Sequence, residues 1–412
     1  VNDNDMAIDE NLGGLATFLD DQHGHGGPSQ WFTALGFTYR GPVDGHNLTQ
    51  LMAAITELQK LPGPKLLHIH TLKGKGYEPA ENDPVGYHAL AKIDPIEAVV
   101  TKHGATYAQV FGQWVCDQAD TDDRLMAITP AMIGGSGLEP FAQQHATRLF
   151  DVAIAEQHAL TLAAGMACEG AKPVVAIYST FLQRGYDQLI HDIVLQDLDI
   201  LLAIDRAGVV GEDGATHTGA YDLAFLRCLP NLLVMAPSSA AETSAMLSFG
   251  FHHHGPAAVR YPRGEAFAEL PLVTPIELGK GQVLQTAIKP DALAILNFGA
   301  LLDKAIVVAE VHGATLVDMR FVKPLDEALL HQLLNQHIGF VTIEDHSCIG
   351  GAGSAVSEWL VQQKSKVRLL CLGHEDAALP HGSRDQGLHH TGLSTTKMVA
   401  RVAEWQAQLL AE

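Results

Sequence analysis

The stretch Asp151-Val-Ala-Ile-Ala-Glu-Gln-His-Ala159 places a carboxylate, an amide and an imidazole at the end of an apolar run. The pattern predicts a buried strand over 149–151 and a helix that begins near Glu156. Burying a carboxylate is unfavourable unless it is hydrogen-bonded or holds a proton. Glu156 is therefore either paired or active in catalysis, although an ordinary acidic residue favoured by the helix N-terminus is the simpler alternative.

Apolar strands alternate with helical segments on both sides of this stretch. Continuous apolar strands indicate parallel sheets covered by helices on both faces, so the fold class is α/β. We predict three parallel-sheet domains, over 1–95, 105–270 and 275–412, with a short Gly/His-rich linker near 22–30. In the first, a helix over 48–61 has Leu51, Ile55 and Leu58 on one face. The predicted strands are 65–71, 125–129, 149–151, 173–178, 200–204, 232–235, 293–297, 314–318, 340–344 and 367–371, and the clearest later helices are 180–197 and 240–251.

The composition excludes some classes of protein. A formal charge of −21 argues against a nucleic-acid or anionic-membrane partner. No apolar run reaches the roughly 20 residues that span a bilayer. The five cysteines are widely spaced without a Cys-x-x-Cys pair, so we expect free, buried thiols and a cytoplasmic location.

Polar motifs follow several of the middle strands. Tyr178-Ser-Thr-Phe-Leu-Gln-Arg184 lies at a strand end, where open α/β sheets bind ligands, and Phe181 and Arg184 share one helix face. The glycine-rich stretch 208–219 contains Asp213 and His217, and a polar loop after a buried strand favours function. Arg260-Tyr-Pro-Arg263 could make bidentate phosphate contacts or be a surface turn. Glu344-Asp-His-Ser-Cys-Ile-Gly-Gly-Ala-Gly353 could bind an anion at a glycine-rich helix start, but it is interpreted as a packing or interface turn.

The first domain has weaker signals. The amide of Asn4 and the carbonyl of Met6 could share a Mg²⁺ ion, or form a simple Asx turn. Lys73-Gly-Lys-Gly-Tyr-Glu-Pro79 allows close approach to a phosphate, with Tyr77 adding a flat face, or is an exposed basic turn. His88 alone is more often structural than catalytic.

Taken together and in order, these motifs resemble the 1-deoxy-D-xylulose-5-phosphate synthase family of thiamine-diphosphate enzymes, in the transketolase superfamily. The further motifs are Gly41-Pro-Val-Asp-Gly-His46, Gly74-Lys-Gly-Tyr-Glu-Pro-Ala80 and Arg260-Tyr-Pro-Arg-Gly264. The resemblance implies that 1–95 is part of the diphosphate-binding domain, 105–270 the pyrimidine-binding domain and 275–412 the C-terminal domain, in a homodimer.

The resemblance also implies roles for single residues. Asn4 and the Met6 carbonyl would hold Mg²⁺. Thiamine diphosphate needs a carboxyl group against its pyrimidine ring, which would be Glu156, with Phe181 stacked on the ring and Tyr77 lining the cleft. His88 and His217 would face the reacting carbon. The acceptor aldehyde and its phosphate would be held by Tyr178, Arg184, Asp213 and Arg263, with Arg260 as the weaker choice.

The implied reaction is the decarboxylating condensation of pyruvate with glyceraldehyde 3-phosphate, which supplies isoprenoid, thiamine and pyridoxal synthesis. The family's upstream Gly-Asp-Gly motif and an upstream His are not in the sequence, and a Gly/His linker near 22–30 stands where the family has a long internal segment. We therefore expect weak cofactor binding by the chain as written. Two alternatives are kept: transketolase-type ketol transfer, and a non-catalytic or cofactor-free assembly subunit.

Overall fold

The computed structural model describes residues 1–6, 14, 18–19, 27–88, 104–267, 274–289 and 291–411. The chain divides into two compact units, Val1–Val100 and Thr101–Glu412, which we describe separately. Both predicted domain boundaries lie largely outside the described residues. The linker predicted near 22–30 is described only from Gly27, where helix α2 (Gly27–Ala34) already begins.

The first unit contains a small parallel sheet in the order β1-β3-β2. Its strands are β1 (Asn2–Asp3), β2 (Thr38–Asp44) and β3 (Lys65–His70), and its helices after α2 are α3 (Leu48–Gln59) and α4 (Glu78–Asn82). On α3 the buried residues are Ala54 and Leu58, whereas Ile55 is exposed. The predicted apolar face is thus wrong at Ile55, since the buried face of the helix includes Ala54 in its place.

The second unit is built around a seven-stranded sheet in the order β13-β8-β9-β7-β6-β4-β5. All neighbouring strands are parallel except β13, which pairs antiparallel with β8. The strands are β4 (Leu125–Thr129), β5 (Leu149–Asp151), β6 (Lys172–Tyr178), β7 (Leu201–Asp205), β8 (Leu233–Met235), β9 (Ala257–Arg260) and β13 (Phe321–Lys323).

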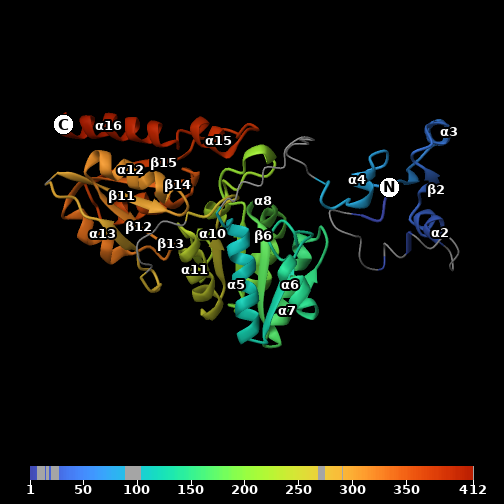
Figure 1. The fold of residues 1–412 in the computed structure, drawn as a ribbon, viewed down its shortest axis with the longest axis horizontal. Coiled ribbons are helices and arrows are strands. Elements are labelled where there is room, and N and C mark those ends of the chain that lie inside the picture. Colours follow the sequence, from blue (N-terminus) through green and yellow to red (C-terminus); the bar gives the residue numbers. More distant parts are fainter. Residues whose placement is uncertain are drawn as a thin grey trace. The chain divides into compact units, whose positions relative to one another are not determined.

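Helices cover both faces of this sheet (Figure 1). Helix α5 (Tyr107–Thr121), which starts with a Thr106/Gln109 capping box, packs with α11 (Ala240–His252) against one face. Helix α7 (Glu156–Cys168) and a broken helical segment over 179–194 pack against the other. A helical segment lies where one was predicted over 180–197, but it passes from α-helix through a 3₁₀ turn into π-helix at Leu189–Val194. The shorter helices are α6 (Glu139–Gln144), α8 (Ser179–Leu182), α9 (Tyr186–Gln188) and α10 (Asp222–Arg227).

A second sheet, in the order β10-β12-β11-β14-β15, follows along the chain. Its strands are β10 (Gln282–Gln285), β11 (Ala292–Phe298), β12 (Thr315–Asp318), β14 (His337–Ser347) and β15 (Arg368–His374), and only β10 is antiparallel. Its helices are α12 (Leu302–His312), α13 (Glu327–Leu334), α14 (Ala352–Gln362), α15 (Arg384–His390) and α16 (Thr395–Ala411), which runs beside α12 (Figure 1).

One apolar core joins the two sheets of the second unit. It includes Val175 and Ile204 from the first sheet, and Leu296 and Phe340 from the second. The parallel-sheet α/β architecture predicted from the apolar runs is confirmed. The five cysteines are free, but Cys168 and Cys228 are exposed, so the expectation of buried thiols is wrong for these two. Among the described residues, no helix combines the length and apolar character needed to cross a membrane.

A buried acidic group lies where the two sheets meet. Asp318, at the end of β12, is 1 % exposed and accepts a hydrogen bond from Ser238 Oγ at 2.5 Å. Nearby, Arg320 Nη2 donates to Glu242 Oε1 at 2.5 Å, and both of these side chains are buried. Burial, and after it the nearby Glu242 carboxylate, raise the pKa of Asp318 from 3.8 to about 7.

This shift predicts a pH dependence of stability. Between the unfolded pKa of 3.8 and the folded pKa of about 7, the native state holds a proton that the unfolded state has lost. The stabilisation is therefore complete below the unfolded pKa and is lost as the pH rises towards 7. We expect unfolding midpoints measured from about pH 5 to about pH 8 to fall less steeply in Asp318→Asn than in the parent protein. Equal slopes would refute the assignment of a proton to Asp318.

Candidate functional site

The predicted site residues of the second unit gather at the carboxyl edge of the seven-stranded sheet. Tyr178 ends β6, Asp205 ends β7 and Arg260 ends β9, while Glu156 begins the helix that follows β5. Because parallel strands all end at the same edge, residues distant in sequence meet there. This edge is the candidate functional site.

Glu156 is buried, with 3 % of its surface exposed, and begins α7. Its Oε1 accepts a hydrogen bond from Arg184 Nη1 at 2.9 Å, and the Arg184 side chain is 55 % exposed. Within the described residues, no second hydrogen-bond partner of this carboxylate is present. Glu156 is thus held at the site by a cation that reaches it from the solvent side.

An aromatic surface stands next to this pair. The rings of Tyr178 and Phe181 are stacked with centroids 5.5 Å apart and an interplanar angle of 11°. The rings of His217 and Phe181 form an edge-on contact with their centroids 5.4 Å apart. Arg184 Cζ is 5.7 Å from the centre of the Phe181 ring. Burial raises the pKa of Tyr178 to about 12, so its hydroxyl remains protonated near neutral pH. A flat, partly buried aromatic face next to a carboxylate can bind a heterocyclic ring.

The glycine-rich stretch between β7 and α10 provides Asp213 and His217. Arg263 Nη1 donates to Asp213 Oδ2 at 2.7 Å and to the Val210 carbonyl at 3.2 Å. His217 Nδ1 lies 2.9 Å from Thr216 Oγ1. Asp213 and Arg263 are both about one-third exposed, so their polar groups can contact a ligand.

Arg260 lies in a different environment from Arg263. It is 4 % exposed and forms a bidentate ion pair with buried Asp222, through Nε at 2.7 Å and Nη2 at 3.2 Å. Its Nη2 also donates to the carbonyl of Asp345 at 3.1 Å. Arg260 is thus occupied inside the protein, and the expectation that it contacts a substrate phosphate is not supported by this geometry.

Arg206 is a site residue that the sequence analysis missed. It follows β7 directly, with a positive φ of 58°, and its guanidinium lies 4.3 Å from the centre of the Tyr178 ring. Arg206 pairs with Asp205 and donates to the Gly135 carbonyl at 2.6 Å. Burial raises the pKa of Asp205 to about 6, against the opposing effect of Arg206. Its position just beyond a strand at the carboxyl edge was the signal that could have identified it.

The first unit contains the other predicted residues. The Met6 N–H donates to Asn4 Oδ1 at 3.2 Å, so the Asx turn that was the simpler alternative does form. Tyr77 is 45 % exposed, and its ring contacts that of Tyr87 edge-on with the ring centroids 5.8 Å apart. His88 is exposed at the end of the described segment, and its N–H donates to the Val85 carbonyl.

The Lys73–Gly76 turn requires glycine. Gly74 has a φ of 81°, and a Cβ there would lie 2.6 Å from the Ala80 carbonyl. The described residues contain no group of three His, Cys, Asp or Glu side chains placed to hold a metal ion. Asn4 and Met6 offer an amide and a carbonyl oxygen, the hard donors that Mg²⁺ prefers, and two such donors need further ligands.

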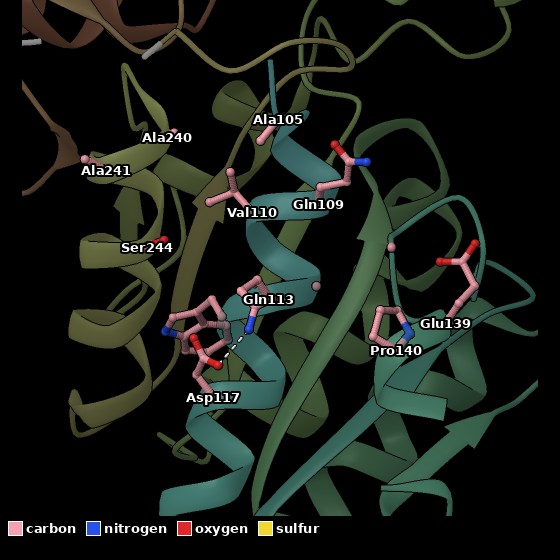
Figure 2. Close-up of a pocket in the computed structure, with 13 residues that line it drawn as sticks. Ala105, Gln109, Val110, Gln113, Asp117, Glu139, Pro140, Ala240, Ala241 and Ser244 are labelled. Atoms are coloured by element: carbon pink, nitrogen blue, oxygen red, sulfur yellow. Dashed lines mark hydrogen bonds between the residues drawn. The ribbon is translucent and has the colours of Figure 1, made fainter. Parts of the chain in front are cut away.

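A cavity of about 880 Å³ lies elsewhere, between α5, α6 and α11 (Figure 2). Gln113 and Asp117 on α5 form a hydrogen bond of 2.8 Å at its wall. None of the predicted site residues lines this cavity, so it is separate from the candidate site.

Sequence profiles of known families match three parts of the chain. The transketolase pyrimidine-binding domain matches residues 103–267, and the transketolase C-terminal domain matches 279–398. The profile described as 1-deoxy-D-xylulose-5-phosphate synthase matches residues 22–71. The candidate site at Glu156 thus lies in a domain of transketolase type.

Relatives with curated names agree with these matches. The 1-deoxy-D-xylulose-5-phosphate synthase of Pseudomonas entomophila is 48 % identical, over 99 % of this chain and 70 % of the relative. The enzyme of the same name from Thioalkalivibrio sulfidiphilus is 54 % identical, over 91 % of this chain and 59 % of the relative. The chain therefore belongs to the 1-deoxy-D-xylulose-5-phosphate synthase family.

Two solved structures resemble the fold. A split-gene transketolase, described as an inactive β4 tetramer, aligns with a TM-score of 0.65 at 28 % identity, over 73 % of this chain and 98 % of its own. A transketolase from Campylobacter jejuni aligns with a TM-score of 0.61 at 14 % identity, over 98 % of this chain and 72 % of its own. The second likeness concerns the fold alone.

Proposed function

We propose that the protein is a transferase that condenses pyruvate with glyceraldehyde 3-phosphate, releasing CO₂ and forming 1-deoxy-D-xylulose 5-phosphate. The observation on which this most depends is the buried Glu156 carboxylate beside an aromatic face at the carboxyl edge of the sheet, in a chain of this family. The product would serve isoprenoid, thiamine and pyridoxal synthesis.

The residues at this edge fit thiamine diphosphate. This cofactor stabilises the carbanion that decarboxylation leaves behind. Glu156 would hold and return a proton at the pyrimidine ring, and Phe181 would lie against the face of that ring. The fit is supported by the burial of Glu156, whose only described partner, Arg184, has a side chain that is 55 % exposed. His217, at the edge of Phe181, would face the reacting carbon.

The acceptor would bind next to these groups. Arg184 and Arg263 are cations with exposed surface, which suits the dianionic phosphate of glyceraldehyde 3-phosphate. The Tyr178 hydroxyl and Asp213 would hold the hydroxyl and aldehyde groups by hydrogen bonds. Each of these arginines is paired with a carboxylate, Arg184 with Glu156 and Arg263 with Asp213, so the substrate phosphate would bind in place of these partners.

The first unit would bind the diphosphate end of the cofactor. Asn4 and the Met6 carbonyl would be Mg²⁺ ligands, Tyr77 would line the cofactor site and His88 would face the reacting carbon. The hard oxygen donors of the Asn4–Met6 turn support the choice of Mg²⁺.

The domain boundaries, the oligomeric state and the location are proposed from the family to which the chain belongs. We divide the chain into a diphosphate-binding part at 1–95, a pyrimidine-binding domain at 105–270 and a C-terminal domain at 275–412. The family profiles at 103–267 and 279–398 support the last two. We propose a homodimer, and a cytoplasmic location that is consistent with five free cysteines.

An activity assay and a binding measurement test the proposed function against its alternatives. Purified protein with thiamine diphosphate and Mg²⁺ should release CO₂ from pyruvate when glyceraldehyde 3-phosphate is present. Product from a phosphoketose donor without CO₂ release would instead indicate ketol transfer. Calorimetric titration with thiamine diphosphate, with and without Mg²⁺, tests binding directly, and no heat in either titration would favour a non-catalytic subunit.

A further inference from the structure

The loop that contains Asp213 and His217 is closed at its base. Gly208 and Gly219 exchange backbone hydrogen bonds of 2.8 and 2.9 Å across this base. Asp213 pairs with Arg263, and His217 meets Phe181. Any shift of the base would therefore move both polar side chains relative to the aromatic face.

A carboxylate from the second sheet holds this base. Asp345, on β14, accepts a buried hydrogen bond of 3.0 Å from the N–H of Val209 through Oδ1. Gly208 has a φ of 78°, and a Cβ there would lie 2.1 to 2.4 Å from the Asp345 carboxyl atoms. The carboxyl group thus fits directly against Gly208, where the absence of a Cβ leaves space for it.

Asp345 is itself fixed on both oxygens. His374 Nε2 lies 2.8 Å from Oδ1, and Arg384 Nη2 donates to Oδ2 at 3.0 Å. Hydrogen bonding by His374 and the Arg384 charge overcome the effect of burial and hold the pKa of Asp345 well below its usual range. The carboxylate is therefore charged and oriented when it meets the Val209 N–H.

Apolar and backbone contacts support the same loop from the same side. Val209 belongs to the apolar core of the second sheet, and a Cβ on Gly387 would lie 2.6 Å from its Cγ1. His381 Nδ1 lies 3.0 Å from the Glu212 carbonyl, and a Cβ on Gly214 would meet the His381 ring at 2.4 Å. The Gly208–Gly219 loop thus contacts residues of the second sheet and of the segment that follows it, at several positions next to Asp213.

We propose that Asp345 is a positioning residue for the acceptor site: from the C-terminal half it fixes the base of the Gly208–Gly219 loop, and with it Asp213 and His217. This inference rests on the proposed function and assigns the C-terminal half a part in substrate recognition. This role differs from a general contribution to the packing of the two sheets of the second unit. A loss of that packing would destabilise the whole unit, whereas the Asp345 contact acts on one loop. Glu156 and Phe181 lie on other elements and should be unaffected.

The test uses Asp345→Ala in the purified protein. We expect the KM for glyceraldehyde 3-phosphate to rise roughly tenfold to a hundredfold, since small displacements of positioning groups have effects of this size. Thiamine diphosphate affinity, measured by calorimetry, should stay unchanged. Amide hydrogen exchange of a peptide covering 208–219 should become faster, while a peptide from α5 should be unchanged.

Two further variants keep the test decisive. Asp345→Asn retains an acceptor for the Val209 N–H and should give a smaller change, and it replaces Asp345→Ala if that variant does not fold. Asp385→Asn, an exposed acid next to Arg384, makes the same charge change and should behave as the parent protein. Unchanged exchange in 208–219, or a loss of cofactor affinity equal to the rise in KM, would overturn the inference. If the parent protein forms no product, the proposed function fails, and the exchange measurement still decides whether Asp345 holds the loop.

Discussion

Replacing Glu156 with glutamine should lower turnover roughly 10²- to 10⁴-fold, the usual contribution of a positioned proton-transfer group. Glutamine has nearly the same shape and can still accept a hydrogen bond from Arg184, but it cannot hold the transferred proton. The measurement is the rate of CO₂ release from pyruvate in the presence of glyceraldehyde 3-phosphate. Unfolding should change little, because the pair that is lost is exposed on the Arg184 side.

The control for this prediction is Glu139→Gln. Glu139 is also the first residue of a helix, α6, but it is exposed. If Glu156 were only a favourable acidic residue at a helix N-terminus, the two variants would have similar, small effects. Turnover close to normal in Glu156→Gln would remove the central assignment of the site.

Much of the fold could be predicted because apolar runs define buried parallel strands. The strands at Leu125–Thr129 and Leu149–Asp151 lie where the sequence predicted them. The strand at Phe321–Lys323 could not be found in this way. It is three residues long, and its partner β8 lies in the preceding sequence domain. Only the packing of the two sheets against each other creates that pairing.

The candidate site could be predicted only in part. Strand ends identify which loops meet at the carboxyl edge, so Tyr178, Asp213 and His217 could be selected from sequence. The ion-pair partner of each charged residue could not be predicted, because it depends on contacts between distant segments. Arg206 follows a strand end and could have been selected by the same rule, but its position over the Tyr178 ring could not be predicted.

Arg260 and Arg263 show most clearly what the sequence left open. They are three residues apart in one motif, and either could have been the phosphate ligand. Asp222, 38 positions earlier in the chain, decides between them by pairing with Arg260 in the protein interior. Arg263 pairs instead with Asp213 at the surface.

This difference predicts opposite effects for two matched substitutions. Arg260→Met leaves the Asp222 carboxylate buried and unpaired, which should destabilise the protein by about 3–5 kcal/mol. For a domain of this size the thermal midpoint should fall by roughly 10 °C. Arg263→Met breaks an ion pair that is about one-third exposed and worth about 1 kcal/mol or less, so the thermal midpoint should stay close to that of the parent protein.

The kinetic constants should show the reverse order. Arg263→Met should raise the KM for glyceraldehyde 3-phosphate roughly tenfold or more, because a charged hydrogen bond to the phosphate is lost. Arg260→Met, assayed below its unfolding transition, should keep a KM close to normal, because its guanidinium faces Asp222 and not the solvent. Thermal unfolding and steady-state kinetics on both variants are sufficient to test this. A stable Arg260→Met protein with a high KM would mean that Arg260 turns outward in solution, and that the buried ion pair with Asp222 does not determine its role.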